Sequence, residues 1–329
     1  MKIAQFKTPG APSVLEYMEV PIPPLKDGEV LVKAQAIGVG MPDILIRQGK
    51  YNWMPPLPAA PGTEMSGTIE QVGPGTTLKV GQRVVVSARE REHRGGCYAE
   101  YNATPESSVY ALPDGADMDE AAALANYQVA FHLLYDCVHV KKGQSVLVYG
   151  AAGGCGSALV DLARGAGLEV IGICSGAEKA AFVKSLGAAH VIDRGAGNLF
   201  DAINMTLGRK GVDIVFDIVG GKDFTRNFEL LGRYGTLVSY GQLGGPVQGD
   251  VFAAMRKQTA RNLALRTFTM HIFDHWPERR KEGMRWLIER LGTHEIKPRI
   301  HGHLPLAQAR QAHELFESGA VMGKLLLKP

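Results

Sequence analysis

A glycine-rich turn between an apolar run and an amphipathic run constrains the fold of this chain more than any other feature. The segment Ser145–Ala163 reads SVLVYGAAGGCGSALVDLA, with Gly150, Gly153 and Gly156 at every third position. Glycine permits a tight turn and lets backbone N–H groups approach a pyrophosphate, while the N-terminus of the following helix carries partial positive charge. A strand, such a turn and a helix in direct succession predict a dinucleotide-binding β-α-β unit.

The residues of this turn are the first expected cofactor contacts. Backbone N–H groups at a helix N-terminus lack partners within the helix, and a phosphate can accept from them. The expected contacts are Gly150, Ala152, Gly153, Gly154, Cys155 and Gly156. A thiol at a helix N-terminus is also a candidate redox site, but for Cys155 we favour a small side chain that fills space in the turn.

The residue after the second strand of this unit indicates which dinucleotide is bound. In NAD-binding proteins an acidic residue about 20 positions beyond the glycines accepts from the ribose 2′-hydroxyl. That place is held here by Ser175, in the run CSGAEK, which can donate to a 2′-phosphate. Lys179 and Arg194 can neutralise the same phosphate, although each alone also fits an ordinary surface residue. The pattern predicts NADPH in preference to NADH.

Three parts of the chain differ in their apolar pattern. Residues 1–119 are short β-branched and aromatic runs broken by Gly and Pro, which predicts a barrel-like antiparallel domain. Residues 120–262 alternate apolar strands with helices, which predicts a doubly wound parallel sheet, and a helix from about Asp119 to Cys137, capped by Asp119, leads into it. Residues 263–329 hold two amphipathic helices and a closing strand that we expect to return to the first domain. The fold class is α/β.

Size and charge agree with a two-domain enzyme more than with a nucleic-acid-binding protein. A chain of 329 residues is long for one domain. Lys and Arg total 36 against 33 Asp and Glu, a formal net charge of +3, which argues against nucleic acid as the main partner.

Cysteine usage and the N-terminus predict a cytoplasmic protein. The four cysteines form no CxxC pair and are typical of reduced thiols: Cys97, Cys137, Cys155 and Cys174. The N-terminal run MKIAQF reads as a strand and not as a signal peptide. No run of about 18 apolar residues occurs, so we expect no membrane partner.

Over essentially its whole length the chain resembles the medium-chain dehydrogenase/reductase superfamily, and within it the quinone oxidoreductases of the zeta-crystallin group. The resemblance rests on GAAGGCG and PGTEMSGTIEQVG, and more loosely on GVGMPDILIRQGKY, ALANYQVAFHLL and GKLLL. It implies a GroES-like β-barrel catalytic domain, a Rossmann domain and an active site in the cleft between them. It also implies hydride transfer from NADPH and a homodimer joined through the Rossmann sheets.

The resemblance does not extend to the metal site of the zinc alcohol dehydrogenases in this superfamily. Gly40 and Thr63 stand where those enzymes have a Cys and a His. Zinc needs thiolate, imidazole or carboxylate ligands, usually three from the protein in a catalytic site, and the cysteines of the structural zinc lobe are missing too. We expect no metal, and without a Lewis acid the dehydrogenation of an unactivated alcohol would be difficult.

The substrate pocket is expected near Gly40, where quinone oxidoreductases usually have an Asn beside the cofactor. The resemblance to enoyl-thioester reductases implies Tyr51 as the proton donor, since a phenol with a reference pKa of about 10 can donate to an enolate; a Tyr that only packs at the cleft mouth is the alternative. Trp53 suggests an apolar lining. Asp43 either lines the pocket or holds the local backbone.

Further cofactor contacts are expected on both sides of the Rossmann domain. Asn126 and Tyr127 are expected to border the nicotinamide, with Tyr127 either a pocket residue or part of the core. Gly241 and Gln242 follow a strand whose carboxyl end is where doubly wound folds bind ligands. Lys324, in the closing strand, resembles the family's cofactor-side lysine.

Three functions remain open. Metal-free hydride transfer needs mainly positioning and a donor for the oxygen where charge develops, so the first is an NADPH-dependent reductase of a quinone or an α,β-unsaturated carbonyl. The second is an enoyl-thioester reductase, for which Arg279, Arg280 and Lys281 would have to supply a basic entrance. The third is a protein that binds NADPH without turnover, as a sensor or structural protein.

Overall fold

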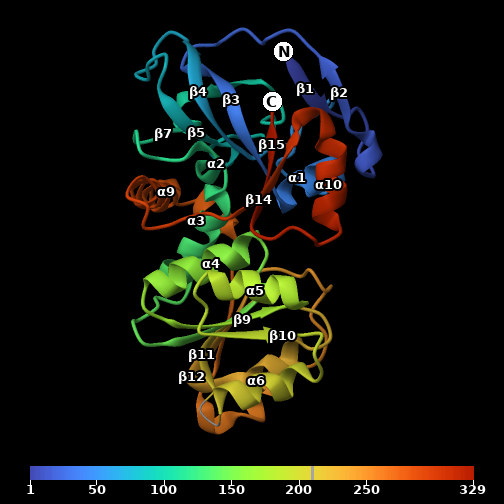
Figure 1. The fold of residues 1–329 in the computed structure, drawn as a ribbon, viewed down its shortest axis with the longest axis vertical. Helices are drawn as coiled ribbons and strands as arrows, with labels where there is room; N and C mark the ends of the chain where they lie inside the picture. Colours follow the sequence, from blue (N-terminus) through green and yellow to red (C-terminus); the bar gives the residue numbers. More distant parts are fainter. Residues whose placement is uncertain (209–210) are drawn as a thin grey trace. The chain divides into compact units, whose positions relative to one another are not determined.

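The computed structural model describes residues 1–208 and 211–329, and their contacts divide the chain into two compact units. Unit 1 contains Met1–Ala125 together with Met284–Pro329, and unit 2 is the continuous stretch Asn126–Gly283. Each unit has its own sheet and its own apolar core, so each is described by itself (Figure 1).

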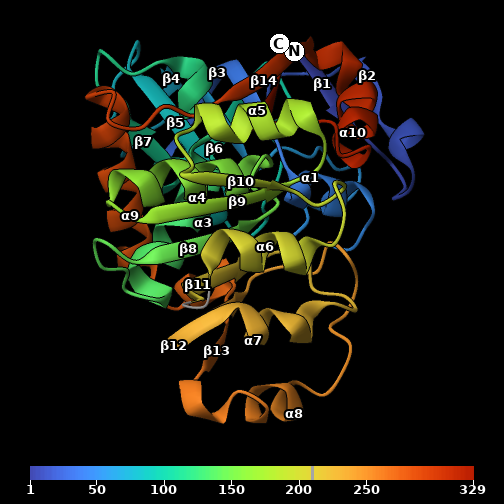
Figure 2. The ribbon, with the colours of Figure 1, turned by 60° about the horizontal axis from the view of Figure 1, so that its bottom comes forward.

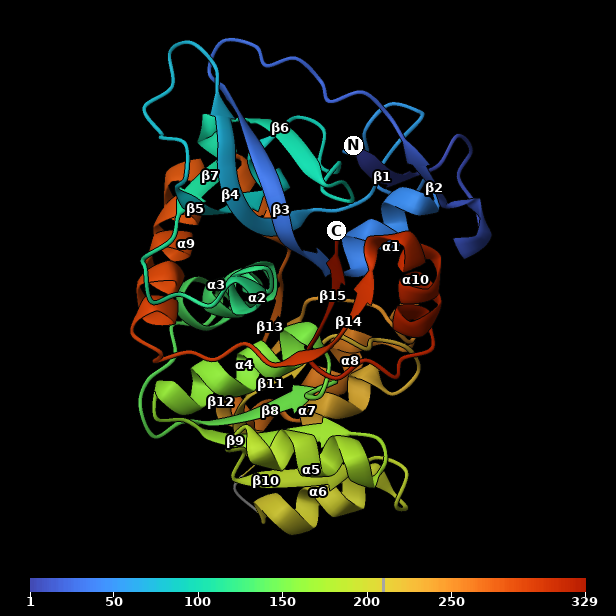
Figure 3. The same cartoon turned by 45° about the horizontal axis from the view of Figure 1, so that its top comes forward.

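Unit 1 is built on a seven-stranded sheet with the order β14-β15-β3-β4-β5-β7, to which β6 is added by pairing with β3. The strands are β3 (Glu29–Val39), β4 (Glu64–Val72), β5 (Arg83–Ser87), β6 (Tyr101–Pro105), β7 (Val109–Ala111), β14 (Ile300–Pro305) and β15 (Lys324–Lys328). Figure 3 shows that β15, at the C-terminal end, lies beside β3 from the N-terminal part. The sheet is antiparallel except for the pair β14–β15, which is parallel.

The remaining elements of unit 1 cover this sheet. They are β1 (Lys2–Gln5), β2 (Glu16–Glu19), the helices α1 (Met41–Arg47), α2 (Met118–Ala121) and α10 (Ala309–Glu317), and the 3₁₀ helices η1 (Pro12–Val14), η2 (Ala88–Glu90), η3 (Glu106–Ser108) and η8 (Leu306–Gln308). The core of unit 1 takes residues from β3, β5 and β15, such as Val30, Val32, Val84, Val86 and Leu325. The residues between them, such as Leu31 and Val85, are buried as well, so both faces of β3 and β5 are covered here.

Unit 2 contains a parallel sheet of six strands in the order β10-β9-β8-β11-β12-β13, visible in sequence in Figure 2. The strands are β8 (Ser145–Tyr149), β9 (Glu169–Cys174), β10 (His190–Asp193), β11 (Val212–Asp217), β12 (Leu231–Ser239) and β13 (Ala264–Thr267). The order reverses between β8 and β11, which is the switch point where doubly wound sheets bind ligands.

Helices lie on both faces of this sheet, with α4 and α5 on one side and α6 on the other (Figure 1). The helices of the unit are α3 (Leu124–His132), the π-helix η4 (Leu133–Cys137), α4 (Gly154–Gly165), α5 (Ala177–Ser185), α6 (Leu199–Leu207), η5 (Phe224–Arg226), α7 (Asn227–Leu230), α8 (Val251–Arg256), η6 (Thr259–Arg261) and η7 (Met270–Asp274). Helix α9 (Pro277–Gly292) spans the division after Gly283. The two-unit α/β architecture predicted from the pattern of strands and helices is confirmed.

Local details differ from the expectations. The lead-in helix is two helices, α2 and α3, and its cap is Asp117, whose carboxylate accepts from the backbone N–H groups of Asp119 and Glu120. Strand β13, assigned from sequence to the C-terminal return, pairs with β12, so the sheet of unit 2 extends beyond residue 262. The division falls at 125/126 and 283/284 rather than at 119/120 and 262/263, because α9 and not a loop joins the sheet to the returning segment.

Candidate active site

The glycine-rich turn of unit 2 has the geometry of a phosphate-binding loop. Gly150 follows β8 with φ of +64°, a conformation that favours glycine, and Gly153 caps α4 with extended backbone. A Cβ on Gly156 would lie 2.1 Å from the carbonyl oxygen of Gly150. The first turn of α4 therefore approaches the end of β8 as closely as backbone allows, and its free N–H groups fit the pyrophosphate of a dinucleotide.

Asn126 lies directly over this turn. A Cβ on Gly154 would be 2.2 Å from the Asn126 amide nitrogen, and the Cys155 thiol donates to the Asn126 amide oxygen across 3.6 Å. The structure thus brings together Asn126, Gly154 and Cys155, as expected of residues around one cofactor site. The thiol is already engaged by Asn126, which agrees with the space-filling interpretation of Cys155.

The turn after β9 gathers the charges expected at a 2′-phosphate. Ser175 follows the strand directly, and Lys179 lies in the first turn of α5. Burial raises the pKa of the adjacent Cys174 thiol, whereas Lys179 and Arg194 act to lower it, so both cations lie near this turn. Arg194 is tied to it by its backbone N–H, which donates to the Cys174 carbonyl at 2.9 Å.

The same turn also holds a carboxylate, that of Asp193, which the sequence analysis overlooked. Asp193 Oδ1 accepts from the backbone N–H groups of Gly176 at 3.0 Å and Gly195 at 2.9 Å. These two bonds hold the pKa of Asp193 below its usual value. The carboxylate therefore shapes the turn, with its charge partly offset by Arg194.

The turn beyond β12 carries Gly241 and Gln242. A Cβ on Gly241 would lie 2.6 Å from the Ile218 side chain, and Gln242 packs beside Gly220 at the end of β11. Both residues lie at the carboxyl edge of the sheet, at the switch point. Tyr240, which the sequence analysis missed, has a buried hydroxyl for which the described residues offer no hydrogen-bond partner, and burial holds its pKa well above the usual value.

Tyr127 has a packing role in unit 2. Its side chain is buried, and its hydroxyl donates to Asp161 Oδ2 on α4 at 2.8 Å. Of the two interpretations of Tyr127, pocket residue or core, this contact favours the core, since the hydroxyl joins α3 to α4.

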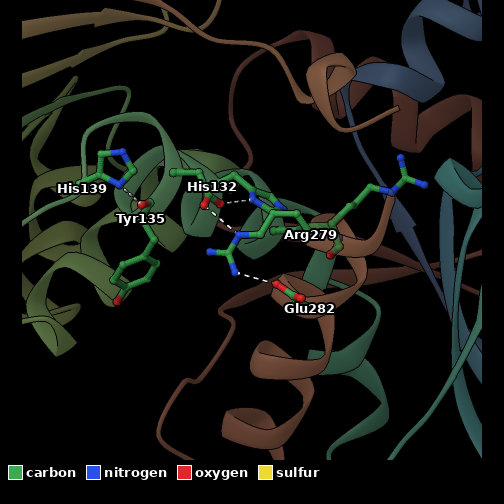
Figure 4. Close-up of polar contacts among 8 residues, drawn as sticks. His132, Tyr135, His139, Arg279 and Glu282 are labelled. Carbon is green, nitrogen blue, oxygen red and sulfur yellow. Dashed lines mark hydrogen bonds and ion pairs between the residues drawn. The ribbon is translucent and has the colours of Figure 1, made fainter. Parts of the chain in front are cut away.

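A further polar cluster ties α3 and the π-helix η4, which carries Asp136, to α9 in unit 2 (Figure 4). Asp136 accepts from His132 Nδ1 at 2.6 Å and from Arg279 Nε at 2.8 Å, and Arg279 also donates to Glu282 at 3.1 Å. Burial lowers the pKa of His132, whose Nε2 has no hydrogen-bond partner among the described residues. The imidazole is packed between Phe131 and Phe273, so this cluster joins helices.

In unit 1, Asp43 holds the start of α1. Its carboxylate accepts from the backbone N–H of Gly40 at 2.8 Å and of Gly62 at 3.0 Å. Burial, opposed by Lys324 and these two bonds, raises the pKa of Asp43 to about 7. Asp43 therefore holds local backbone and is at the same time a carboxyl group that titrates near neutral pH.

Lys324 reaches the same place from the closing strand. Its ammonium forms a short ion pair with Glu64 Oε1, and both side chains are nearly inaccessible. Glu64 Oε2 accepts from the backbone N–H of Ala125 at 2.8 Å. Gly40 and Asp43, at the start of α1, and Lys324, in β15, are thus brought together, and Glu64 of β4 is a fourth member that sequence reasoning missed, although it directly follows Thr63.

Tyr51 and Trp53 form a separate group in unit 1. Their rings lie 5.6 Å apart and tilted, and Tyr51 packs in an apolar cluster with Phe6, Ile46 and Ala59. Arg94 stacks over Trp53 with its guanidinium 4.7 Å from the ring centre. Trp53 packs against the same apolar cluster, while the hydroxyl of Tyr51 forms no hydrogen bond within the described chain.

Among residues 1–208 and 211–329, no group of three or more His, Cys, Asp or Glu side chains is arranged to hold a metal ion. The carboxylate oxygens of Asp43 accept from backbone N–H groups, and those of Glu64 accept from a backbone N–H group and from Lys324. In the same part of the chain, no helix is long and apolar enough to span a membrane.

Comparisons with known proteins agree with this geometry. Residues 26–114 match the model of the alcohol dehydrogenase GroES-like domain, and residues 186–327 match that of the zinc-binding dehydrogenase domain. Quinone oxidoreductase of Rattus norvegicus is 32% identical over 322 residues, covering 97% of this chain and 94% of the relative.

Solved structures cover the whole chain. The Escherichia coli quinone oxidoreductase complexed with NADPH is 28% identical, with a TM-score of 0.88 over 100% of both chains. A mycobacterial protein complexed with NADPH is 32% identical, with a TM-score of 0.86 over 100% of both chains. The GroES-like unit and the Rossmann unit are therefore shown, and the chain belongs to the quinone oxidoreductase group of the medium-chain dehydrogenase/reductase family and is an oxidoreductase.

Proposed function

We propose that this oxidoreductase uses NADPH to reduce a quinone or an α,β-unsaturated carbonyl without zinc. The observation that carries the cofactor assignment is the turn after β9. Ser175 stands there in place of an acidic residue. Lys179 and Arg194 lie near this turn, since the charges of both lower the pKa of the Cys174 thiol. A 2′-phosphate would meet two cations there. The Escherichia coli and mycobacterial relatives in complex with NADPH support the same choice.

The glycine loop fits the rest of the dinucleotide. Gly156 approaches Gly150 so closely that no side chain fits between them, and the backbone N–H groups of the first turn of α4 suit a pyrophosphate. When bound, NADPH supplies the hydride. The cofactor would be bound and oriented by Asn126, Gly154 and Cys155. Gly241 and Gln242 line the carboxyl edge of the sheet.

Zinc-independence is proposed from the residue types at the metal position. Gly40 has no side chain, Thr63 is a poor zinc ligand, and the neighbouring Asp43 and Glu64 are committed to other partners. Quinones and α,β-unsaturated carbonyls suit such a site, because they spread the charge that develops in the transition state. Tyr51 remains our proposed proton donor to the reduced carbon skeleton.

The enoyl-thioester alternative receives little support from α9. It needed a basic entrance from Arg279, Arg280 and Lys281. Arg279 is engaged by Asp136 and Glu282, Arg280 is buried against Asp274, and Lys281 pairs with Glu278. These contacts leave no concentration of uncommitted charge for phosphopantetheine, so the small-molecule acceptor is preferred.

We further propose a cytoplasmic homodimer joined through the sheets of unit 2. Strand β13 is one of the two edges of that sheet among the described strands, and the exposed Tyr234 and Phe252 lie in the same unit. All four cysteines are free thiols, which fits a reducing compartment.

The test of function is NADPH oxidation, followed by absorbance, with 9,10-phenanthrenequinone, 1,4-benzoquinone, 2-alkenals and crotonyl-CoA. Each acceptor is assayed with and without EDTA, and with NADH in parallel. Rapid, EDTA-insensitive oxidation of NADPH with a quinone or alkenal is expected. A preference for crotonyl-CoA would replace the proposal with the enoyl-thioester reductase, and saturable NADPH binding without turnover of any acceptor would favour the non-catalytic alternative.

A further inference from the structure

We propose that Lys324 is a catalytic residue whose ammonium binds the carbonyl oxygen of the acceptor and stabilises the negative charge that develops there. Its position in the closing strand had indicated a contact with the cofactor, and the structure points instead to an oxyanion site beside Gly40. The proposal rests on the reductase activity proposed above, but its first test needs no turnover.

Lys324 is held in one place by its surroundings. Glu64 Oε1 pairs with the ammonium while Glu64 Oε2 is fixed by the backbone N–H of Ala125. A Cβ on Gly38 would lie 2.6 Å from the Lys324 side chain and 2.8 Å from the Glu64 side chain, so this glycine of β3 forms the floor beneath the pair. An ammonium fixed in this way is preorganised, which is what makes an electrostatic catalyst effective.

The side chain missing from Gly40 leaves room for one atom next to this ammonium. A Cβ at that position would lie 3.5 Å from Lys324 Nζ, 3.6 Å from Pro42 and 3.8 Å from Asp43 Oδ2. These are ordinary van der Waals distances, so a group the size of one methyl fits there without a clash, and Gly40 itself is only half-buried. An oxygen entering there would meet the ammonium.

Lys324 has hydrogen-bonding capacity left for that oxygen. An ammonium carries three donors, and within the described chain its one hydrogen-bond acceptor is Glu64. Asp43 is close but already accepts from the N–H groups of Gly40 and Gly62. A buried donor without a partner is unfavourable, and an acceptor oxygen supplies the partner.

The chemistry balances without a metal. The β-carbon of the enone accepts a hydride from C4 of the reduced nicotinamide, and the electron pair of its C=C bond moves through the carbonyl onto the oxygen. The Lys324 ammonium donates a hydrogen bond to this enolate oxygen, and Tyr51 or solvent supplies the proton that completes the C–H bond at the α-carbon. For a quinone, the hydride adds to a ring carbon, one proton from solvent neutralises the resulting oxyanion, and transfer of the ring C–H proton to the second oxygen completes the hydroquinone. The acceptor gains two electrons and NADPH loses two.

The first test uses 4-nitrophenol as an oxyanion probe, without cofactor or turnover. At a pH where most of the free probe is un-ionised, the wild-type protein should bind it as the yellow phenolate, with a saturable rise in phenolate absorbance. Gly40→Ala should weaken this binding by about 10-fold or more, because the methyl group occupies the space beside the ammonium. The backbone at Gly40 is extended, with φ of −152°, so alanine fits without strain.

The matched control is Gly302→Ala in β14, where an added Cβ meets nothing within 4 Å; its phenolate binding should equal that of the wild type. Lys324→Met alone would leave Glu64 buried without a partner and endanger folding. The double variant Lys324→Met/Glu64→Gln removes both charges, and it should lose the phenolate signal while its circular dichroism stays native.

The second test separates an acceptor contact from a cofactor contact. Gly40→Ala should lower kcat/KM for both 1,4-benzoquinone and a 2-alkenal by about 10-fold or more, and leave the Kd of NADPH within a factor of about 2. The proposal is overturned if wild-type protein gives no phenolate signal, or if Gly40→Ala and the double variant bind the phenolate as wild type does. It is also overturned if Gly40→Ala weakens NADPH and leaves acceptor kinetics intact, since Lys324 would then serve the cofactor.

Discussion

A Cβ on Gly156 would lie 2.1 Å from the carbonyl oxygen of Gly150, well inside any van der Waals contact. Gly156→Ala must therefore push the first turn of α4 away from β8 and displace the N–H groups that face the pyrophosphate. We expect the Kd of NADPH to rise by about 10-fold or more, because several charge-assisted hydrogen bonds lose their geometry together. Fluorescence titration of the protein with NADPH measures this directly.

Gly165→Ala is the control for the Gly156 variant. Gly165 is exposed at the end of the same helix, and an added Cβ there meets nothing within 4 Å. Its substitution should leave the Kd of NADPH unchanged and raise the free energy of unfolding by about 0.5–1 kcal/mol, since alanine is the better helix former. Equal effects of the two substitutions on NADPH affinity would remove the steric account of the loop.

Lys179→Ala tests the assignment of the 2′-phosphate. Because Lys179 and Arg194 act on the turn after β9, losing one cation should raise the Kd of NADPH by about 10-fold and change that of NADH by less than about 2-fold. Isothermal titration with the two cofactors gives both constants.

Lys184→Ala carries the same change of net charge from the exposed last turn of α5. It should leave both dissociation constants within a factor of about 2, since Lys184 lies five residues further along α5, about 7.5 Å along the helix axis, and an exposed charge that makes no direct contact is weakened by solvent and salt. Equal weakening of NADPH and NADH by Lys179→Ala would place the lysine elsewhere than at a 2′-phosphate.

The phosphate-binding loop could be predicted from the sequence because the residues that form it are neighbours along the chain. Gly150, Gly153 and Gly156 follow one another within a single turn, and the backbone conformations they need are properties of the residues themselves. The same holds for the alternation of apolar strands and helices in unit 2, which depends on periodicity within short windows.

The ion pair between Glu64 and Lys324 in unit 1 could not be predicted in this way. Glu64 and Lys324 are 260 positions apart, and they meet over Gly38 because β3 pairs with β15 on one side and with β4 on the other. Strand β13 was missed because its residues, ALRT, are half-buried or exposed and carry no apolar run. Capping by Asp117 rather than Asp119 could not be decided, since either carboxylate satisfies the preference at an N-cap.

Tyr51→Phe tests the proposed source of the α-carbon proton. The ring packs with Phe6 and Ile46, and phenylalanine keeps this packing, so stability and the Kd of NADPH should not change. We expect kcat for a 2-alkenal to fall by about 10-fold or more, and kcat for 1,4-benzoquinone to fall less, because a quinone needs no proton on carbon. Unchanged turnover of the alkenal would leave Tyr51 as a packing residue.

The pKa of Asp43 predicts an unusual pH dependence of stability. Burial raises it from 3.8 to about 7, so between these values the folded state binds a proton that the unfolded state has lost. The contribution of Asp43 is therefore fully present below pH 4 and is lost as the pH rises through 7. Relative to Asp43→Asn, which cannot ionise, the wild type should lose stability over this range, on the order of 4 kcal/mol at about 1.36 kcal/mol per pKa unit.

The matched variant Glu106→Gln should show the opposite sign. Hydrogen bonds from Thr77 and Leu78 lower the pKa of Glu106, so its contribution is present at neutral pH and is lost as the pH falls through the acid range. Denaturant unfolding of the wild type and both variants from pH 2 to pH 8 gives the two differences. A wild-type advantage over Asp43→Asn that grows with pH would show that the buried carboxylate is ionised throughout, with Lys324 outweighing its burial.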